Sequence, residues 1–158
     1  IDGRSLRLPT ISVRPGKPNL AASSFASGII REPLAGVPAI CPVSRDTRIW
    51  LLSPRKVIAS LIHAFELPST AWSVNRVVNL PGCTAVVGEM IDALRQIAGD
   101  VVADRIEIRP EARIEALVKS WPACFRNDRA RSMGFVADED VESIINAYID
   151  DERIALQR

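Results

Sequence analysis

Residues 6–19 read LRLPTISVRPGKPN, and this stretch decides the fold because it joins a strand to a loop. Leu6 to Val13 is rich in β-branched and apolar residues, which predicts a β-strand. The following RPGKPN, residues 14–19, holds two prolines and a glycine, which predicts a loop and excludes a helix. Ligands of α/β proteins bind at the carboxyl ends of strands, so this junction is the first candidate site.

Strands and helices alternate along the rest of the chain. Apolar periodicity predicts helices over residues 23–34, 53–66, 84–99 and 110–119, and a last helix that starts near residue 138. Extended segments are predicted at 76–80, at 105–109 and twice within 39–52. Short connections between alternating strands and helices indicate an α/β or α+β layer arrangement.

Two of these helices carry clear end signals. Ser53 is suited to the N-cap of the 53–66 helix and Pro54 to its first position. Thr84 is predicted to cap the 84–99 helix, which Gly99 ends in a left-handed conformation. The apolar residues of the 53–66 helix form one stripe, made of Val57, Ile58, Leu61, Ile62 and Phe65.

Composition excludes several classes of protein. The 158 residues are 47% hydrophobic and 25% charged with a net charge of +1, which gives no electrostatic case for nucleic acid or an anionic membrane. No apolar run approaches the roughly 20 residues that span a bilayer. Because the chain begins at Ile1 without a signal-peptide core, we expect that start to be a cut.

The cysteines predict neither a metal site nor a disulfide. Cys41, Cys83 and Cys124 lie far apart, and His63, the single histidine, has no cysteine near it in sequence. We therefore expect three reduced thiols in a cytoplasmic protein and no metal.

No catalytic motif is present in the sequence. The chain lacks Gly-x-Gly-x-x-Gly, Gly-x-Ser-x-Gly and His-Glu-x-x-His. Gly16-Lys17 does not make a phosphate loop, because Pro18 stands where Ser or Thr is required and no glycine lies at the needed distance upstream. By motif alone the chain offers no enzyme.

A polar loop system remains. Cations and hydroxyls follow the first strand, and further arginines lie in the polar segment after residue 43; these residues are Arg14, Lys17, Asn19, Ser23, Ser24, Ser27, Arg45 and Arg48. Arginine forks and hydroxyls suit a small polyhydroxylated anion, because a guanidinium holds a carboxylate by two parallel hydrogen bonds. The alternative reading is that these are solvated loop residues.

Four segments carry a family resemblance: LPTISVRPGKPN (8–19), AASSF (21–25), SGIIREPL (27–34) and PVSRDTRIW (42–50). They resemble the extended short-chain dehydrogenase/reductase superfamily, the NAD-dependent epimerase/dehydratase family, and within it the D-erythronate dehydrogenases. The resemblance implies the C-terminal part of a Rossmann-type protein. Residues 1–16 would be the last part of the Rossmann core, and 17–158 an α+β substrate-binding domain with some elements packing back on the Rossmann sheet.

The resemblance also implies what the chain lacks. A full-length relative would be about twice as long, with the glycine fingerprint and a Tyr-x-x-x-Lys catalytic pair in its N-terminal half. The only tyrosine here, Tyr148, is followed four residues on by Glu152, so it is not that pair and a core role is expected. No catalytic residue is expected in this chain, and NAD or NADP would bind tightly only to the intact protein.

Roles are implied for the loop residues. Pro15 and Gly16 match the turn that lies against the nicotinamide. Lys17, Asn19, Ser23 and Ser24 would face a sugar acid. The anion-holding arginine would be Arg48, or else its neighbour Arg45.

Three functions stay open at this point. The first is an NAD-dependent dehydrogenase acting on a small sugar acid such as D-erythronate. The second is a nucleoside-diphosphate-sugar epimerase or dehydratase, and the third a non-catalytic module that binds a small anion or a protein. We expect small-molecule partners and a possible homodimer. His63, the three tryptophans and the acidic segment 138–140 are expected to be structural.

Overall fold

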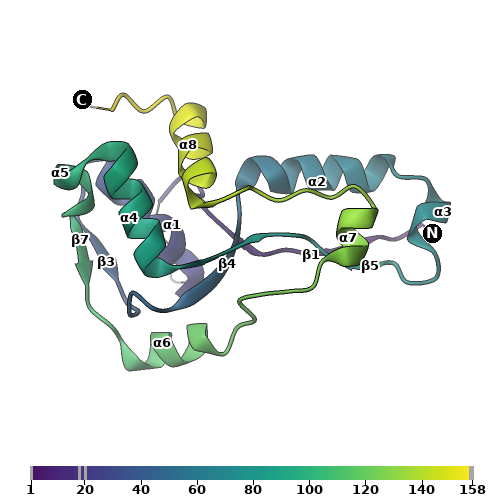
Figure 1. Cartoon of the computed structure of the whole chain (residues 1–158), viewed down its shortest axis with the longest axis horizontal. Coiled ribbons are helices and arrows are strands. Elements are labelled where there is room, and N and C mark those ends of the chain that lie inside the picture. The colour runs from purple at the N-terminus through teal and green to yellow at the C-terminus, as the bar shows by residue number, and fades with distance from the viewer. Residues whose placement is uncertain (1, 18, 20, 157–158) are drawn as a thin grey trace.

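The computed structural model describes residues 2–17, 19 and 21–156. Two hydrophobic clusters lie at opposite ends of the molecule, joined by the central strands (Figure 1). The predicted α/β arrangement is confirmed. Pro18, which excludes a phosphate loop in the sequence, and Ile1, the expected cut, lie outside the described residues.

The predicted strand over residues 6–13 forms two short pieces. β1 spans Ser5–Arg7 and β2 spans Thr10–Ile11. Pro9 lies between them, and a proline donates no hydrogen bond to a sheet. β1 pairs in parallel with β5 (Val77–Asn79), whereas β2 pairs in parallel with β4 (Arg48–Leu52). The single predicted strand therefore contributes to two separate sheets.

The second sheet corrects one prediction about a helix start. β4 pairs antiparallel with β6 (Cys83–Val86), and α4 (Val87–Ala98) begins only after that strand. Thr84 is thus a strand residue, and its hydroxyl donates to the carbonyl of Ala123 at 2.7 Å instead of capping the helix. Gly99 ends α4 with a φ of 85°, as predicted.

The larger cluster is built around three helices. α1 (Phe25–Leu34), entered through a 3-10 turn at Ala22–Ser24, packs on α4, and α8 (Val141–Asp151) packs on α4 from another side. α5 (Asp100–Ala103) follows α4, and a third sheet pairs β3 (Ala39–Cys41) in parallel with β7 (Ile106–Ile108). α6 (Ala112–Lys119) crosses below this end in Figure 1.

The smaller cluster lies under α2 (Pro54–Glu66), beside α3 (Ser69–Trp72) and α7 (Asp128–Ser132). The predicted apolar stripe of α2 is largely exposed to solvent in this chain. Val57 is buried, but the other four side chains are 52–84% exposed, namely Ile58, Leu61, Ile62 and Phe65. The face that packs inward carries the small residues Ser60 and Ala64, which let α2 lie close to its neighbours.

A buried polar joint connects the two ends of the molecule. The Ser53 hydroxyl caps α2 by accepting from the Lys56 N–H at 3.2 Å, as predicted. The same hydroxyl and the Ser53 N–H both donate to the carboxylate of Asp138, each at 2.7 Å. Asp138 therefore holds α2 in place, and the N-cap of α8 is Asp140, which accepts from the Ser143 N–H at 2.7 Å.

Among the described residues, no helix is both long and apolar enough to cross a bilayer. The described part of the chain also contains no cluster of side chains that could hold a metal ion.

Candidate functional site

The turn after β2 is fixed by α1 from both sides. The Arg14 N–H donates to the Ser27 hydroxyl at 3.0 Å, and the Arg31 guanidinium donates to the Arg14 carbonyl at 2.8 Å. Arg31 is buried and also pairs with Glu32 at 2.6 Å. The backbone of Arg14 is therefore held in one position, and the loop that follows starts from a rigid point.

Beyond that point the loop is open to solvent. Pro15, Gly16 and Lys17 are exposed. Gly16 has a φ of 92°, in the region that favours glycine, and a Cβ built there would meet nothing within 4 Å. The turn thus offers a bare stretch of backbone that a flat group can approach closely.

Asn19 and Ser24 shape the loop with their own side chains. The Ser24 hydroxyl accepts from the Asn19 N–H at 3.3 Å, and the Asn19 side-chain oxygen accepts from the Ala21 N–H at 3.0 Å. Both residues were predicted to face a substrate, and both line a hollow of about 430 Å³ beside α1. Glu32 lines the same hollow, and its Oε2 is buried without a hydrogen-bond partner among the described residues.

A second hollow lies at the carboxyl end of β2. It measures about 360 Å³ and brings together Arg14 and Ser23 from the loop system with Thr10 from the strand. Trp121, from the segment after α6, also lines this open hollow. Trp121 is one of the tryptophans for which a structural role is predicted, and no motif in the sequence marks it as a wall of this hollow.

The two candidate anion-holding arginines differ in their surroundings. Arg45 donates to both carboxylate oxygens of Asp92 on α4, at 2.7 and 2.8 Å. Arg48 is exposed at the first position of β4, and its guanidinium has no hydrogen-bond or ion-pair partner in the part of the chain that the structure describes. Neither arginine lines the β2 hollow.

Several residues that were expected to be structural are placed in packing roles. Burial among the residues of the larger cluster raises the pKa of Tyr148, which is 9% exposed. His63 lies within hydrogen-bond distance of the Met133 carbonyl through Nε2, at 2.8 Å, and packs edge-on against Phe135. Trp72 is fully buried in the smaller cluster. These positions confirm the core role predicted for Tyr148 and the structural role of His63.

A scan against known protein families finds no match. Individual relatives are nevertheless similar over almost the whole chain. This chain is 54% identical over 155 residues to a D-erythronate dehydrogenase of Cupriavidus necator, and the match covers 98% of this chain and 48% of that protein. It is 43% identical over 150 residues to a D-erythronate dehydrogenase of Haemophilus influenzae, covering 95% of this chain and 48% of the relative.

Solved structures show the same likeness. A nucleoside-diphosphate-sugar epimerase from Agrobacterium tumefaciens superposes with a TM-score of 0.94 at 42% identity, over 99% of this chain and 46% of that one. An L-threonine 3-dehydrogenase from Trypanosoma brucei superposes with a TM-score of 0.81 at 19% identity, over 94% of this chain and 45% of that one. The second likeness shows the fold alone.

These likenesses show that the chain has the α/β fold of the nucleoside-diphosphate-sugar epimerase and of the L-threonine 3-dehydrogenase. Two of its curated relatives are D-erythronate dehydrogenases, as the sequence resemblance predicted. The chain spans about half the length of these relatives.

Proposed function

We propose that this chain is the substrate-facing half of an NAD-dependent dehydrogenase that oxidises a hydroxyl of a small sugar acid such as D-erythronate. The observation that carries the proposal is the 54% identity to a D-erythronate dehydrogenase over 98% of the chain. Because the chain spans about half of that relative, the intact enzyme needs a dinucleotide-binding half in addition.

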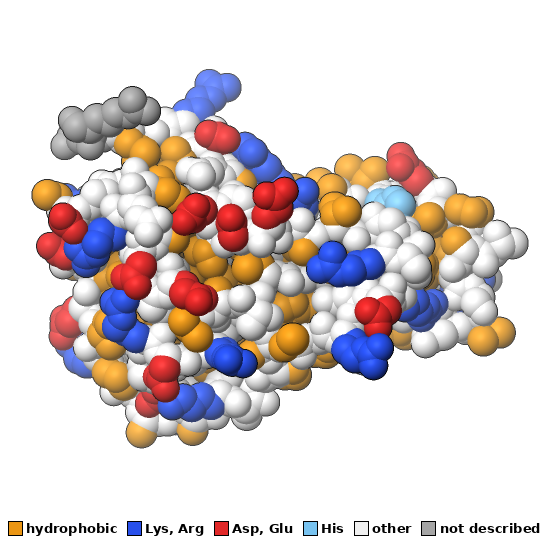
Figure 2. Space-filling model, viewed as in Figure 1, with side chains coloured by type: hydrophobic (Ala, Val, Ile, Leu, Met, Phe, Trp, Pro, Cys, Tyr) orange, Lys and Arg blue, Asp and Glu red, His pale blue; other side chains and the backbone are white. Residues whose placement is uncertain are grey.

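The surface around β1 supports such a division. Among the described residues, β1 and β5 pair only with each other, so this parallel pair has free edges. Parallel sheets are normally larger and covered on both faces. The exposed side chains of α2 lie beside it, and Figure 2 shows hydrophobic side chains gathered around the single histidine of that helix. We assign residues 1–16 to the end of the dinucleotide-binding domain and 17–158 to the substrate domain, of which β5 and α2 would pack back on the dinucleotide-binding sheet.

The open turn fits a nicotinamide ring. Gly16 presents backbone with no side chain, so Pro15 and Gly16 would form one wall against the ring. The bound dinucleotide, NAD or NADP, would accept the hydride. The glycine fingerprint that holds the pyrophosphate has no counterpart in this sequence, so this chain would supply only that wall and would not bind the cofactor tightly alone.

For the sugar acid, we assign the hydroxyl contacts to Lys17, Asn19, Ser23 and Ser24, and the carboxylate to Arg48. Arg48 is preferred over Arg45 because the guanidinium of Arg45 is already held by both oxygens of Asp92. A free arginine fork can form a charge-assisted pair with a substrate carboxylate.

The experiment joins this chain to the remaining half of the Cupriavidus necator relative and measures NAD reduction with D-erythronate. Arg48→Gln should raise KM for the acid about tenfold or more, while Arg113→Gln, an exposed arginine of α6, should leave it unchanged. An equal KM in Arg48→Gln and the parent would remove Arg48 from the site.

The epimerase is a second candidate, favoured by the TM-score of 0.94 to a nucleoside-diphosphate-sugar epimerase. A nucleotide sugar would need the room that the hollow beside Asn19 and Ser24 offers. The same joined protein is assayed with nucleotide sugars. Turnover of nucleotide sugars, with none of free sugar acids, would replace the proposed dehydrogenase activity by an epimerase activity.

A cytoplasmic location and a homodimer remain predictions, as does the absence of nucleic-acid and membrane partners.

A further inference from the structure

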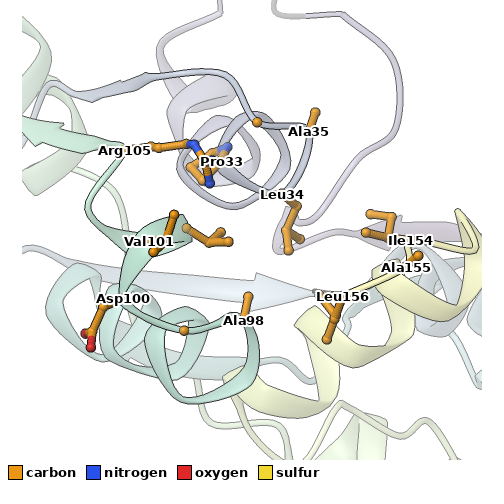
Figure 3. A pocket seen from close by; sticks show the side chains of 13 residues that line it. Pro33, Leu34, Ala35, Ala98, Asp100, Val101, Arg105, Ile154, Ala155 and Leu156 are labelled. Atoms are coloured by element: carbon orange, nitrogen blue, oxygen red, sulfur yellow. The ribbon is translucent and has the colours of Figure 1, made fainter. Parts of the chain in front are cut away.

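A hollow at the far end of the molecule shares no lining residue with either hollow near β2. It measures about 440 Å³ and lies between the end of α1, the α4–α5 junction and the C-terminal segment 154–156 (Figure 3). Three segments remote in sequence therefore meet around one space. Its residues are absent from the site that the proposed function uses.

Apolar and polar atoms contribute to the lining in similar measure, and two charged residues, Asp100 and Arg105, belong to it. Leu34, Val101 and Leu156 surround the space from its three sides (Figure 3). Asp100 points away from it in the same view and pairs with Arg95 at 2.5 Å. The same guanidinium also pairs with Asp104 at 2.9 Å, so Arg95 engages the carboxylates of both Asp100 and Asp104.

Arg105 is the cation, and it is half-buried beside Pro33 (Figure 3). Its guanidinium has no hydrogen-bond or ion-pair partner among residues 2–17, 19 and 21–156. At the end of α1, the N–H groups of Ala35, Gly36 and Val37 bond three of the last four carbonyls of that helix, at 2.8–3.0 Å, so backbone donors cap most of this end without Arg105. A half-buried guanidinium that is held by no acceptor favours an anion from outside.

We propose that this hollow binds a small carboxylate with a short apolar tail. The carboxylate pairs with Arg105, and the tail packs between Leu34, Val101 and Leu156. Because the C-terminal segment forms one wall, a bound ligand ties that segment to α1 and α5.

The test uses the 158-residue chain and hexanoate as the probe. Calorimetric titration should show saturable binding of hexanoate, and hexylamine, which has the same tail and the opposite charge, should not bind. Two-dimensional NMR should place the shifts on residues 33–36, 98–102 and 154–156. Chemical shift changes at Arg14 and Ser23 instead would overturn the proposal. A titration that does not saturate by about 10 mM hexanoate would also overturn it.

Two variants test the positive charge of Arg105 and the apolar wall of the hollow separately. Arg105→Gln should weaken hexanoate binding about tenfold or more, and Arg113→Gln should leave it unchanged. Val101→Glu is a second variant that keeps the fold, since Val101 is 75% exposed, and its carboxylate should repel the probe. Unchanged affinity in both Arg105→Gln and Val101→Glu would overturn the assignment.

Discussion

The buried guanidinium of Arg31 donates a hydrogen bond to the backbone carbonyl of Arg14 at 2.8 Å, so a helix residue fixes the start of the loop that carries the candidate site. The Arg31 side chain is 9% exposed and its partner Glu32 is 15% exposed. Nothing in the sequence pattern marks this pair, since adjacent Arg and Glu in a helix ordinarily lie at the surface.

Arg31→Met should destabilise the chain by about 2–4 kcal/mol, because it leaves a largely buried carboxylate and the Arg14 carbonyl without a donor. Urea unfolding measures the change. The double variant Arg31→Met, Glu32→Met is the control, and it should recover part of the loss because no unpaired charge remains. A single variant as stable as the parent would show that this pair does not clamp the turn.

Gly82→Ala should be costly because the chain approaches Gly82 closely. A Cβ at this position would contact Nε1 of Trp50 and would lie 2.7 Å from the Leu51 carbonyl. We expect a loss of about 1–3 kcal/mol in thermal unfolding, typical of overpacking. Gly3→Ala is the matched control, since a Cβ at Gly3 meets nothing within 4 Å, and it should change stability by less than about 0.5 kcal/mol.

The exposed face of α2 should govern association more than stability. Leu61→Gln with Phe65→Gln should change the free energy of unfolding by less than about 0.5 kcal/mol, because those side chains are 52% and 84% exposed. Val57→Ala, at 7% exposure, should cost about 1–3 kcal/mol by the same assay. When this chain is joined to a dinucleotide-binding half, the double Gln variant should be less stable than the joined parent. Equal stability of the two proteins would show that α2 does not pack between the halves.

The three cysteines should react in the order of their exposure. Burial raises the pKa of the Cys41 thiol, and burial together with nearby acidic side chains raises that of Cys83. Only the thiolate attacks a disulfide reagent, so at pH 8 the exposed Cys124 should react first and Cys41 only after unfolding. Labelling followed by mass spectrometry gives the order, and early modification of Cys41 would contradict the packing of the larger cluster.

Local signals in the sequence predicted local structure well. The Ser53 cap and the Gly99 helix end were both confirmed, because each depends on a few neighbouring residues. The apolar stripe of α2 was predicted from spacing, but spacing does not say which neighbour covers a stripe, and most of this one is exposed in the chain. Asp138 was read as a helix start, whereas its role depends on Ser53, which lies far from it in the sequence.

The candidate site was predictable only in part. The strand-to-loop junction and the open turn at Gly16 followed from prolines and glycine, and the structure brings Arg14 and Ser23 to one hollow. Trp121 lines that hollow from a segment about a hundred positions away. The ion pair between Arg45 and Asp92 depends on how β4 and α4 pack. Such contacts are set by tertiary structure and leave no local pattern.

The central claim is that this chain is one half of an NAD-dependent enzyme, and calorimetric NAD titration tests it most directly. The 158-residue chain is titrated beside the same chain joined to the dinucleotide-binding half of the Cupriavidus necator relative. We predict clear saturable binding by the joined protein and none by the short chain. Tight binding by the 158-residue chain alone would contradict the division of roles and would place the cofactor site on residues other than Pro15 and Gly16.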